Sequence, residues 1–108
     1  MVEFLHNGIG TVIYPHATIG DGSMTCQNVT IGDATLYRDY VGDGTFKGVV
    51  IGDRVTIGAG AKVMCSDGVL SVGAGSVIGA NAELTRSTGR DEIWAGVLAR
   101  MISKRTNK

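Results

Sequence analysis

Two histidines, His6 and His16, are the residues of this chain best suited to proton transfer. An imidazole changes its charge near neutral pH, so it can remove a proton from a reacting hydroxyl group and later return it. The only cysteines are Cys26 and Cys65, too few for a disulfide framework or a zinc quartet, and we expect free thiols. A catalytic zinc held by three histidines would need more imidazoles than the chain has. We therefore expect no metal site.

Composition excludes several other classes of function. Lysine and arginine number 10, as do aspartate and glutamate, so net charge does not favour a nucleic-acid partner. The 44% hydrophobic content argues against disorder. The sequence has no run of about 18 apolar residues that could span a membrane and no pattern of a secretory signal. We expect a single cytoplasmic domain without nucleic-acid or membrane partners, and its small size favours self-association.

Glycine provides the main structural signal, at 17 of 108 residues. Many glycines follow an aliphatic residue within a repeating frame of six residues. Repeats begin at Asn7, Ile13, Ile19, Thr25, Ile31, Ile51, Ile57, Val63, Val72, Ile78 and Leu84. The fifth position of the frame is small or β-branched, at Thr11, Ala17, Ser23, Val29, Thr35, Val55, Ala61, Ser76 and Ala82.

A period of six matches neither a simple strand nor a simple helix. It indicates a coil of three short strands, in which the first and fifth residues of each repeat point inward. Glycine at the second position permits backbone conformations that a side chain would penalise. Coils of this kind stack at the ordinary strand spacing of about 4.8 Å. The sequence thus predicts an all-β solenoid, the parallel β-helix of hexapeptide repeats.

The repeats occupy residues of about 7–35 and 49–87, and residues 36–48 form a longer loop. Insertions in a solenoid usually become loops on one face, which is often the binding face. Residues 88–108 form a tail. Within it, the apolar spacing of Val97–Lys104 predicts a short helix, which would cap the open end of the solenoid.

Several segments resemble the hexapeptide-repeat acyltransferases, in particular the serine acetyltransferase-like branch. The matching segments are Ile57–Val63, Val72–Gly79, Ala95–Arg100, Gly8–Ile13 and Gln27–Gly32. The resemblance implies a left-handed β-helix that assembles as a homotrimer. It also implies an acetyl-CoA-dependent O-acetyltransferase, with acetyl-CoA in a groove between neighbouring subunits and a histidine as general base.

The resemblance also suggests roles for individual residues. His6 precedes a Gly-Ile segment, as the catalytic base does in the family, and His16 is the second choice for the base. The residues expected to bind CoA are Ala59, Gly60, Gly79, Ala80, Gly96 and Arg100. The acceptor is a small hydroxyl compound, serine-like or a sugar, and the sequence does not identify it.

Two positions depart from the family pattern. Gly48 stands where serine acetyltransferases carry a second histidine, and Leu98 stands where the family usually has proline. The missing histidine keeps an alternative open, a catalytically degenerate β-helix whose role is structural trimerisation. The Ala95–Arg100 segment favours the enzyme, because a purely structural trimer has no need of a CoA-binding end.

Overall fold

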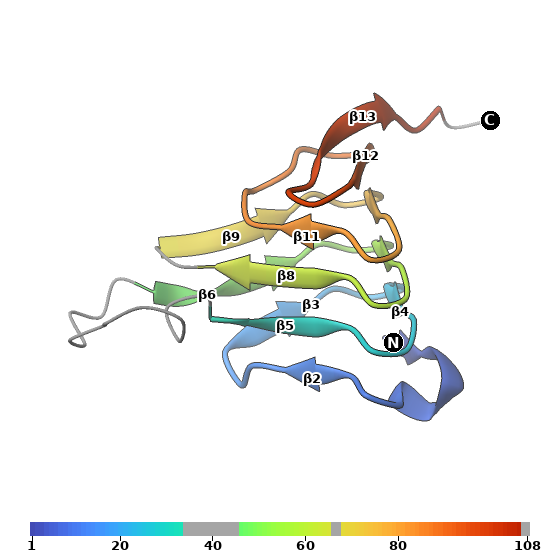
Figure 1. Ribbon diagram of the computed structural model, residues 1–108, viewed down its shortest axis with the longest axis vertical. Helices are drawn as coiled ribbons and strands as arrows, with labels where there is room; N and C mark the ends of the chain where they lie inside the picture. Colours follow the sequence, from blue (N-terminus) through green and yellow to red (C-terminus); the bar gives the residue numbers. More distant parts are fainter. Residues whose placement is uncertain (34–45, 66–67, 107–108) are drawn as a thin grey trace.

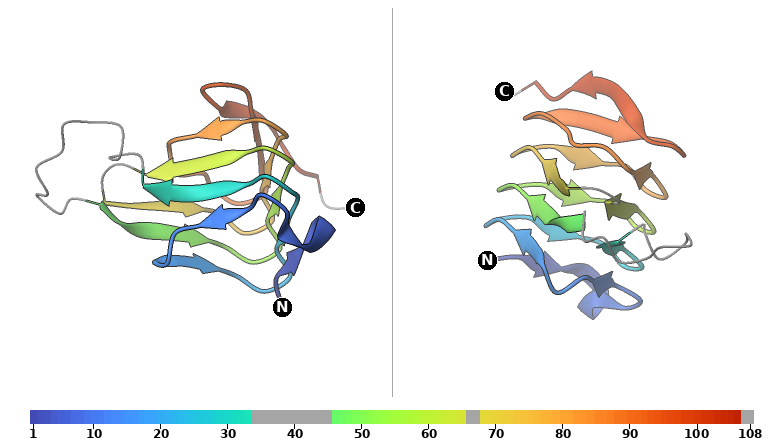
Figure 2. Two further views of the ribbon diagram at one scale, coloured as in Figure 1. Left: turned by 60° about the horizontal axis from the view of Figure 1, so that its bottom comes forward. Right: turned by 90° about the vertical axis from the view of Figure 1, so that its left-hand side faces the viewer.

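A computed structural model describes residues 1–33, 46–65 and 68–106. Over these residues the chain forms a left-handed parallel β-helix with three sheets (Figures 1 and 2). The first sheet contains β1 (Glu3–Phe4), β4 (Met24–Thr25), β7 (Thr56–Ile57), β10 (Val77–Ile78), β12 (Glu92–Ala95) and β13 (Arg100–Lys104). The second contains β2 (Val12–Ile13), β5 (Thr30–Asp33), β8 (Lys62–Cys65) and β11 (Glu83–Leu84). The third contains β3 (Ala17–Ile19), β6 (Phe46–Ile51) and β9 (Gly68–Val72).

The strand register confirms the predicted turn of three six-residue sides. Val12 pairs with Thr30, 18 residues later. Thr30 then pairs with Lys62 across the long interruption, so that segment adds chain length without moving the following repeats to another sheet. Most of the loop predicted at 36–48 lies outside the described residues, and its last residues belong to β6.

The predicted inward positions form the core of the solenoid. Among the first residues of the repeats, Ile31, Ile57 and Ile78 are at most 1% exposed. The fifth-position residues Val55 and Ala61 have no exposed surface. Stacked aliphatic side chains therefore remove a continuous apolar column from water, which supplies the main driving force for the fold.

The N-terminal coil departs from the predicted frame. Phe4, rather than Asn7, pairs with Thr25 in the first sheet, so the expected repeat start at Asn7 is wrong. The cause is a short 3-10 segment, η1 (Leu5–Gly8), in which His6 and Asn7 have positive φ angles of 55° and 58°. This segment adds residues between the first strand and the next corner.

The coil also continues beyond Leu84, the last repeat start that the sequence reveals. The Thr88 backbone N–H donates to the Ser71 carbonyl over 2.9 Å, and the Thr88 hydroxyl accepts a bond from the Gly73 N–H over 3.0 Å. Trp94 then pairs with Ile78 and is 9% exposed. Threonine and tryptophan thus take the inward places that aliphatic residues hold in earlier coils.

The helix predicted at Val97–Lys104 is wrong. Residues Arg100–Lys104 form β13, which pairs antiparallel with β12 and is the uppermost strand in Figure 1. The final strand of a solenoid has an edge of unpaired backbone groups, and β13 satisfies those of β12. The apolar residues that suggested a helix, Val97, Leu98, Met101 and Ile102, are all exposed. An amphipathic helix would have buried them.

Candidate functional site

The three sheets meet at three edges, where each coil turns. The first edge joins the first sheet to the second, the second edge joins the second to the third, and the third edge joins the third back to the first. At the first and third edges one residue of each turn has a positive φ. These residues are Gly10, Asn28, Gly60 and Asn81 at the first edge, and Gly22, Arg54, Gly75 and Asp91 at the third.

Backbone hydrogen bonds align the turns of the first edge. The Asn28 N–H donates to the Ile9 carbonyl over 2.8 Å. In the next coils, the Gly60 N–H donates to the Gln27 carbonyl over 3.0 Å and the Asn81 N–H donates to the Ala59 carbonyl over 2.9 Å. Equivalent atoms of successive turns are therefore spaced by about 4.8 Å, as in a parallel sheet.

Most of the residues predicted to bind CoA lie along this first edge. Ala59 with Gly60 and Gly79 with Ala80 occupy the turns after β7 and β10. Gly96 follows β12, and its carbonyl accepts a hydrogen bond of 3.0 Å from the Glu83 N–H.

Two backbone donors remain available along the first edge. Within the described part of the chain, the N–H groups of Ala59 and Ala80 have no hydrogen-bond acceptor. Both residues retain accessible surface. This edge therefore offers donors one coil apart, a spacing suited to an extended ligand with several carbonyl groups.

His6 lies at the beginning of the same edge. It is part of η1, and its carbonyl accepts a hydrogen bond of 3.2 Å from the Ile9 N–H, at the first-edge turn of the first coil. Two coils separate that turn from the one at Ala59, a rise of roughly 10 Å. The imidazole is exposed and forms no hydrogen bond within the described residues. It is thus free to approach a ligand.

His16 lies at the second edge, between β2 and β3, and the structure does not bring it together with His6. Its ring packs against Tyr14, with the ring centroids 5.4 Å apart. In the next coil, Gly48 lies directly beside it, and a Cβ added at Gly48 would lie 3.0 Å from the His16 carbonyl oxygen. Gly48 also has a φ of 147°, so a histidine at this position would strain the backbone.

Arg100 is set apart from the first-edge turns. It is the first residue of β13, pairs with Ala95 and is exposed. The Trp94 indole N–H donates to the Glu92 carboxylate over 3.0 Å. Trp94 therefore packs into the last coil and does not form an exposed surface for an adenine ring.

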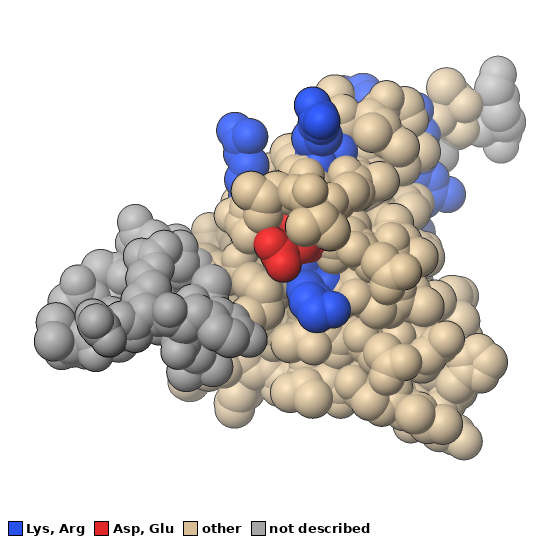
Figure 3. Space-filling view, in the orientation of Figure 1, with Lys and Arg blue, Asp and Glu red and all other residues tan. Residues whose placement is uncertain are grey.

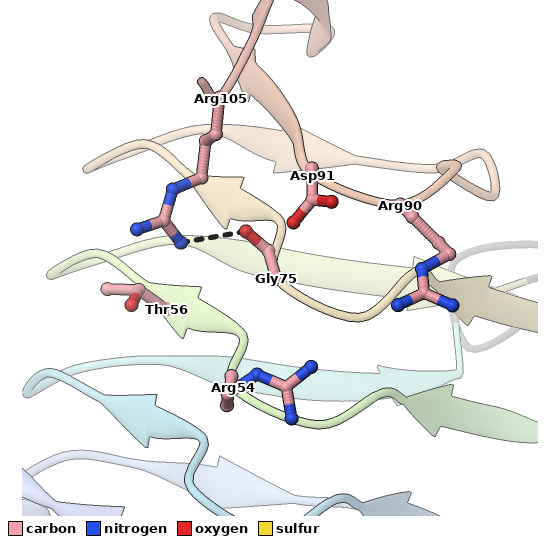
Figure 4. A pocket seen from close by; sticks show the side chains of 6 residues that line it. All are labelled: Arg54, Thr56, Gly75, Arg90, Asp91 and Arg105. Carbon is pink, nitrogen blue, oxygen red and sulfur yellow. Dashed lines mark hydrogen bonds between the residues drawn. The ribbon is translucent and has the colours of Figure 1, made fainter. Parts of the chain in front are cut away.

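Sequence reasoning missed a pocket at the third edge. Figure 4 shows its lining residues around Gly75: Arg54, Thr56, Gly75, Arg90, Asp91 and Arg105. The pocket has a volume of about 300 Å³. A signal was available in the sequence, because Asp53-Arg54 and Arg90-Asp91 occupy equivalent turn positions after Gly52 and Gly89. The aliphatic residue that marks earlier repeats is replaced by Thr88, which obscured the second of these turns.

The second sheet carries fewer cationic side chains than the lining of the third-edge pocket does. Figure 3 looks onto this sheet and shows a mostly uncharged surface, with one acidic and one basic patch side by side near its centre and further basic side chains around its upper end. Lys62 and Glu83 are neighbours across β8 and β11. Cationic side chains are thus more concentrated at the third-edge pocket than on this sheet.

No group of three or more His, Cys, Asp or Glu side chains among the described residues could hold a metal ion. No helix among them is long and apolar enough to cross a membrane.

Comparison with known proteins identifies the family. No family model matches the chain. The plasmid serine acetyltransferase of Synechococcus elongatus is 41% identical over 87 residues, which cover 78% of this chain and 26% of the relative. The serine acetyltransferase of Helicobacter pylori strain J99 is 36% identical over 104 residues, which cover 94% of this chain and 54% of the relative. The chain thus spans between about a quarter and about half of the length of these relatives.

Solved structures agree with the sequence relatives. The crystal structure of serine acetyltransferase from Brucella abortus in complex with coenzyme A superimposes with a TM-score of 0.79 and 30% identity. The match covers 98% of this chain and 39% of that chain. By sequence and by fold, the chain is a serine acetyltransferase-like member of the hexapeptide-repeat acyltransferases.

Proposed function

We propose that the chain is the β-helical part of an acetyl-CoA-dependent O-acetyltransferase whose acceptor is a small hydroxyl compound, with serine as the first candidate. The arrangement of the first edge is the main support. His6 and the unpaired N–H groups of Ala59 and Ala80 follow one edge of the solenoid. The Brucella abortus relative was crystallised with coenzyme A, which supports the same cosubstrate for this chain.

His6 serves as the general base in this proposal. It removes the proton from the acceptor hydroxyl while the hydroxyl oxygen attacks the carbonyl carbon of the thioester. The tetrahedral intermediate then collapses, the C–S bond breaks, and the departing CoA sulfur receives the proton from the imidazolium. Backbone N–H groups near the reacting carbonyl stabilise the negative charge on its oxygen.

The first-edge turns hold the extended part of CoA. The N–H groups of Ala59 and Ala80 donate to its carbonyl groups, and the glycines Gly60, Gly79 and Gly96 let the ligand approach the backbone closely. Arg100 pairs with a CoA phosphate through a charge-assisted hydrogen bond. His16 remains the alternative base, and its position at the second edge requires a different placement of the acceptor.

A homotrimer completes the site. The first edge of one subunit is an open surface, and a groove that encloses CoA needs a second wall from a neighbouring subunit. Exposed apolar residues on the outer faces of the sheets, such as Val12, Val50 and Val69, are available for such contacts.

Ligand-dependent stability and turnover test the proposal together. We expect acetyl-CoA at one hundred times its dissociation constant to stabilise the folded protein by about 2.7 kcal/mol, because it binds only the folded state. Thermal unfolding measures this shift, and a thiol reagent follows CoA release with serine, a sugar or an amine as acceptor.

The possible outcomes separate the candidate functions. Stabilisation by acetyl-CoA, together with CoA release only when serine is present, supports serine as the acceptor. CoA release with a sugar would instead identify a sugar hydroxyl as the acceptor. If neither acetyl-CoA nor CoA changes the unfolding temperature, the chain is a structural trimerisation module. Light scattering at the same concentrations reports the oligomeric state.

A further inference from the structure

We propose that the third-edge pocket binds the phosphate group of a small phosphorylated molecule through Arg54, Arg90 and Arg105. This inference does not depend on the acetyltransferase proposal, because the pocket lies at a different edge from Ala59 and Ala80.

The charge of the pocket favours an anion. Its lining contains three guanidinium groups and one carboxylate, that of Asp91, which leaves an excess of two positive charges. Within the described residues, none of the three arginines forms an ion pair. The chain as a whole has no net charge, so the positive charge is concentrated locally. A phosphate dianion matches this excess, and guanidinium groups bind phosphate oxygens in a planar, bidentate manner.

Two nearby carboxylates, those of Asp53 and Glu92, are engaged elsewhere. The Asp53 carboxylate accepts a hydrogen bond of 2.9 Å from the Asp21 N–H in the preceding coil. The Glu92 carboxylate accepts bonds from the Trp94 indole and the Gly89 N–H, over 3.0 and 2.7 Å. These bonds lower the pKa of Glu92, so it remains an anion committed to the last coil. The Asp91 carboxylate lies over Gly75, in the space that a Cβ there would occupy.

One of the arginines is held in place before any ligand binds. The Arg105 guanidinium donates to the Gly75 carbonyl over 2.8 Å, and the Arg105 N–H donates to the Asp91 carbonyl over 2.6 Å. Figure 4 shows Arg105 on one side of Gly75 and Arg90 on the other, with Arg54 below. A cation fixed in advance loses less conformational freedom when a ligand binds.

Arg54 occupies a backbone conformation that does not favour arginine. Its φ is 55°, in a left-handed region where the equivalent turn residues are Gly22, Gly75 and Asp91. Glycine and aspartate tolerate this region better than a long side chain does. An arginine at this position is therefore unfavourable for the turn itself, which is consistent with a role for its side chain in binding.

The edge already binds one anionic group through its backbone, because the Asp21 N–H of the first-coil turn donates to the Asp53 carboxylate rather than to a carbonyl group. In the fourth coil, Arg90 takes the place that Asp53 has in the second. The Arg90 turn thus carries a cationic side chain where the Arg54 turn carries the internally bound Asp53 carboxylate, which leaves room for an external anion.

Inorganic pyrophosphate is a suitable probe, used with the full chain in a chloride buffer of constant ionic strength. We expect saturable binding with one site per chain by calorimetry, and NMR shifts at the amides of Gly75 and Thr56. The substitutions Arg54→Gln and Arg90→Gln should each weaken binding at least about tenfold, because each removes a charge-assisted contact. The matched control is Lys62→Gln, which removes a cation from the second sheet and should leave the affinity unchanged.

Several results would overturn the proposal. Equal affinity in the wild type and both arginine variants would exclude this pocket as the binding site. Equal binding of citrate at the same ionic strength would indicate general attraction of anions rather than a phosphate site. A parallel loss of CoA affinity in Arg54→Gln would assign the pocket to the acetyl-CoA site. Circular dichroism of each variant shows whether a loss reflects unfolding.

Discussion

The first and third edges are built on the same turn but carry different side chains. In both, a glycine with positive φ alternates with a longer polar residue of positive φ in the next coil. The longer residues are Asn28 and Asn81 at the first edge, and Arg54 and Asp91 at the third.

Glycine and longer residues alternate because the space between two successive coils holds only one side chain at each turn. The amide oxygen of Asn81 lies where a Cβ of Gly60 would be, and the carboxylate of Asp91 lies in the same way over Gly75. Each long side chain thus covers a glycine of the preceding coil. Because this requirement concerns size and backbone conformation, the charge of the long residue remains free to vary, and the two edges can bind different ligands.

The largest expected effect is a loss of acetyl transfer when the histidine of the first edge is replaced, compared with the histidine of the second edge. We expect His6→Gln to reduce kcat/KM for acetyl transfer at least about 100-fold, the usual loss when a general base is removed. His16→Gln serves as the matched variant, and steady-state thiol release measures both. If His16→Gln shows the large loss and His6→Gln does not, the base lies at the second edge.

The shared backbone predicts similar stability losses at both edges. A Cβ at Gly58, on the first edge, would lie 2.6 Å from the Ala80 nitrogen, and one at Gly52, on the third, 2.8 Å from the Ala74 nitrogen. Each alanine substitution should lower the free energy of unfolding by about 3 kcal/mol, because backbone atoms of the next coil must move. Urea denaturation at fixed chain concentration measures the loss.

The matched control for this experiment is Gly79→Ala. The nearest atom to a Cβ added at Gly79 would be the side-chain Cβ of Ala95, at 3.3 Å, and the nearest backbone atom would be at 3.5 Å. We expect a loss below about 1 kcal/mol. An equal loss for all three variants would show that contact with the next coil does not set the need for glycine.

Some of the inward residues that follow a turn also differ between the two edges. Ala61 and Ala82 hold this place at the first edge, whereas Ser76 at the third donates to the Gly89 carbonyl over 2.8 Å and accepts from the Glu92 N–H over 3.1 Å. Ser76→Ala should therefore lower the free energy of unfolding by about 2 kcal/mol, since it removes both hydrogen bonds of the buried Ser76 hydroxyl and leaves the Glu92 N–H without its acceptor. Ser71→Ala on the exposed face of β9 is the control, and an equal effect there would contradict the argument.

The smallest expected effect is a gain in stability. Arg54→Asn should raise the free energy of unfolding by about 0.5 to 1 kcal/mol, because asparagine tolerates the left-handed backbone better than arginine. The reverse exchange at the first edge, Asn81→Arg, should lower it by a similar amount. Thermal and urea unfolding measure both, and destabilisation by Arg54→Asn would show that the arginine side chain supports the turn.

The sequence predicted the solenoid because its repeat reports directly on burial. Ile31, Ile57 and Ile78 could be assigned to the core from the six-residue frame alone. The last coil could not, because Thr88 and Trp94 are not the aliphatic residues of the pattern, although they fill the same places. The terminal strand β13 was mistaken for a helix, because its apolar spacing carries no information about the unpaired edge of β12.

The candidate site was predictable only in part. The match to known motifs led to Ala59, Ala80 and His6, and the register then aligned them along one edge. The third-edge pocket was missed, since its arginines come from three separate segments and Arg105 reaches Gly75 only through the pairing of β13 with β12.

The sequence by itself therefore determined the repeat, the inward residues and the family to which the chain belongs. The repeat and the inward residues follow from a local six-residue pattern that the central coils share, and the family follows from the segments that match its motifs. The tertiary structure alone decided which coils stack at which edge, that η1 moves His6 to the first edge, and that three arginines share one pocket. Those outcomes depend on insertions and on the closing strand, whose effects appear only when distant segments are brought together.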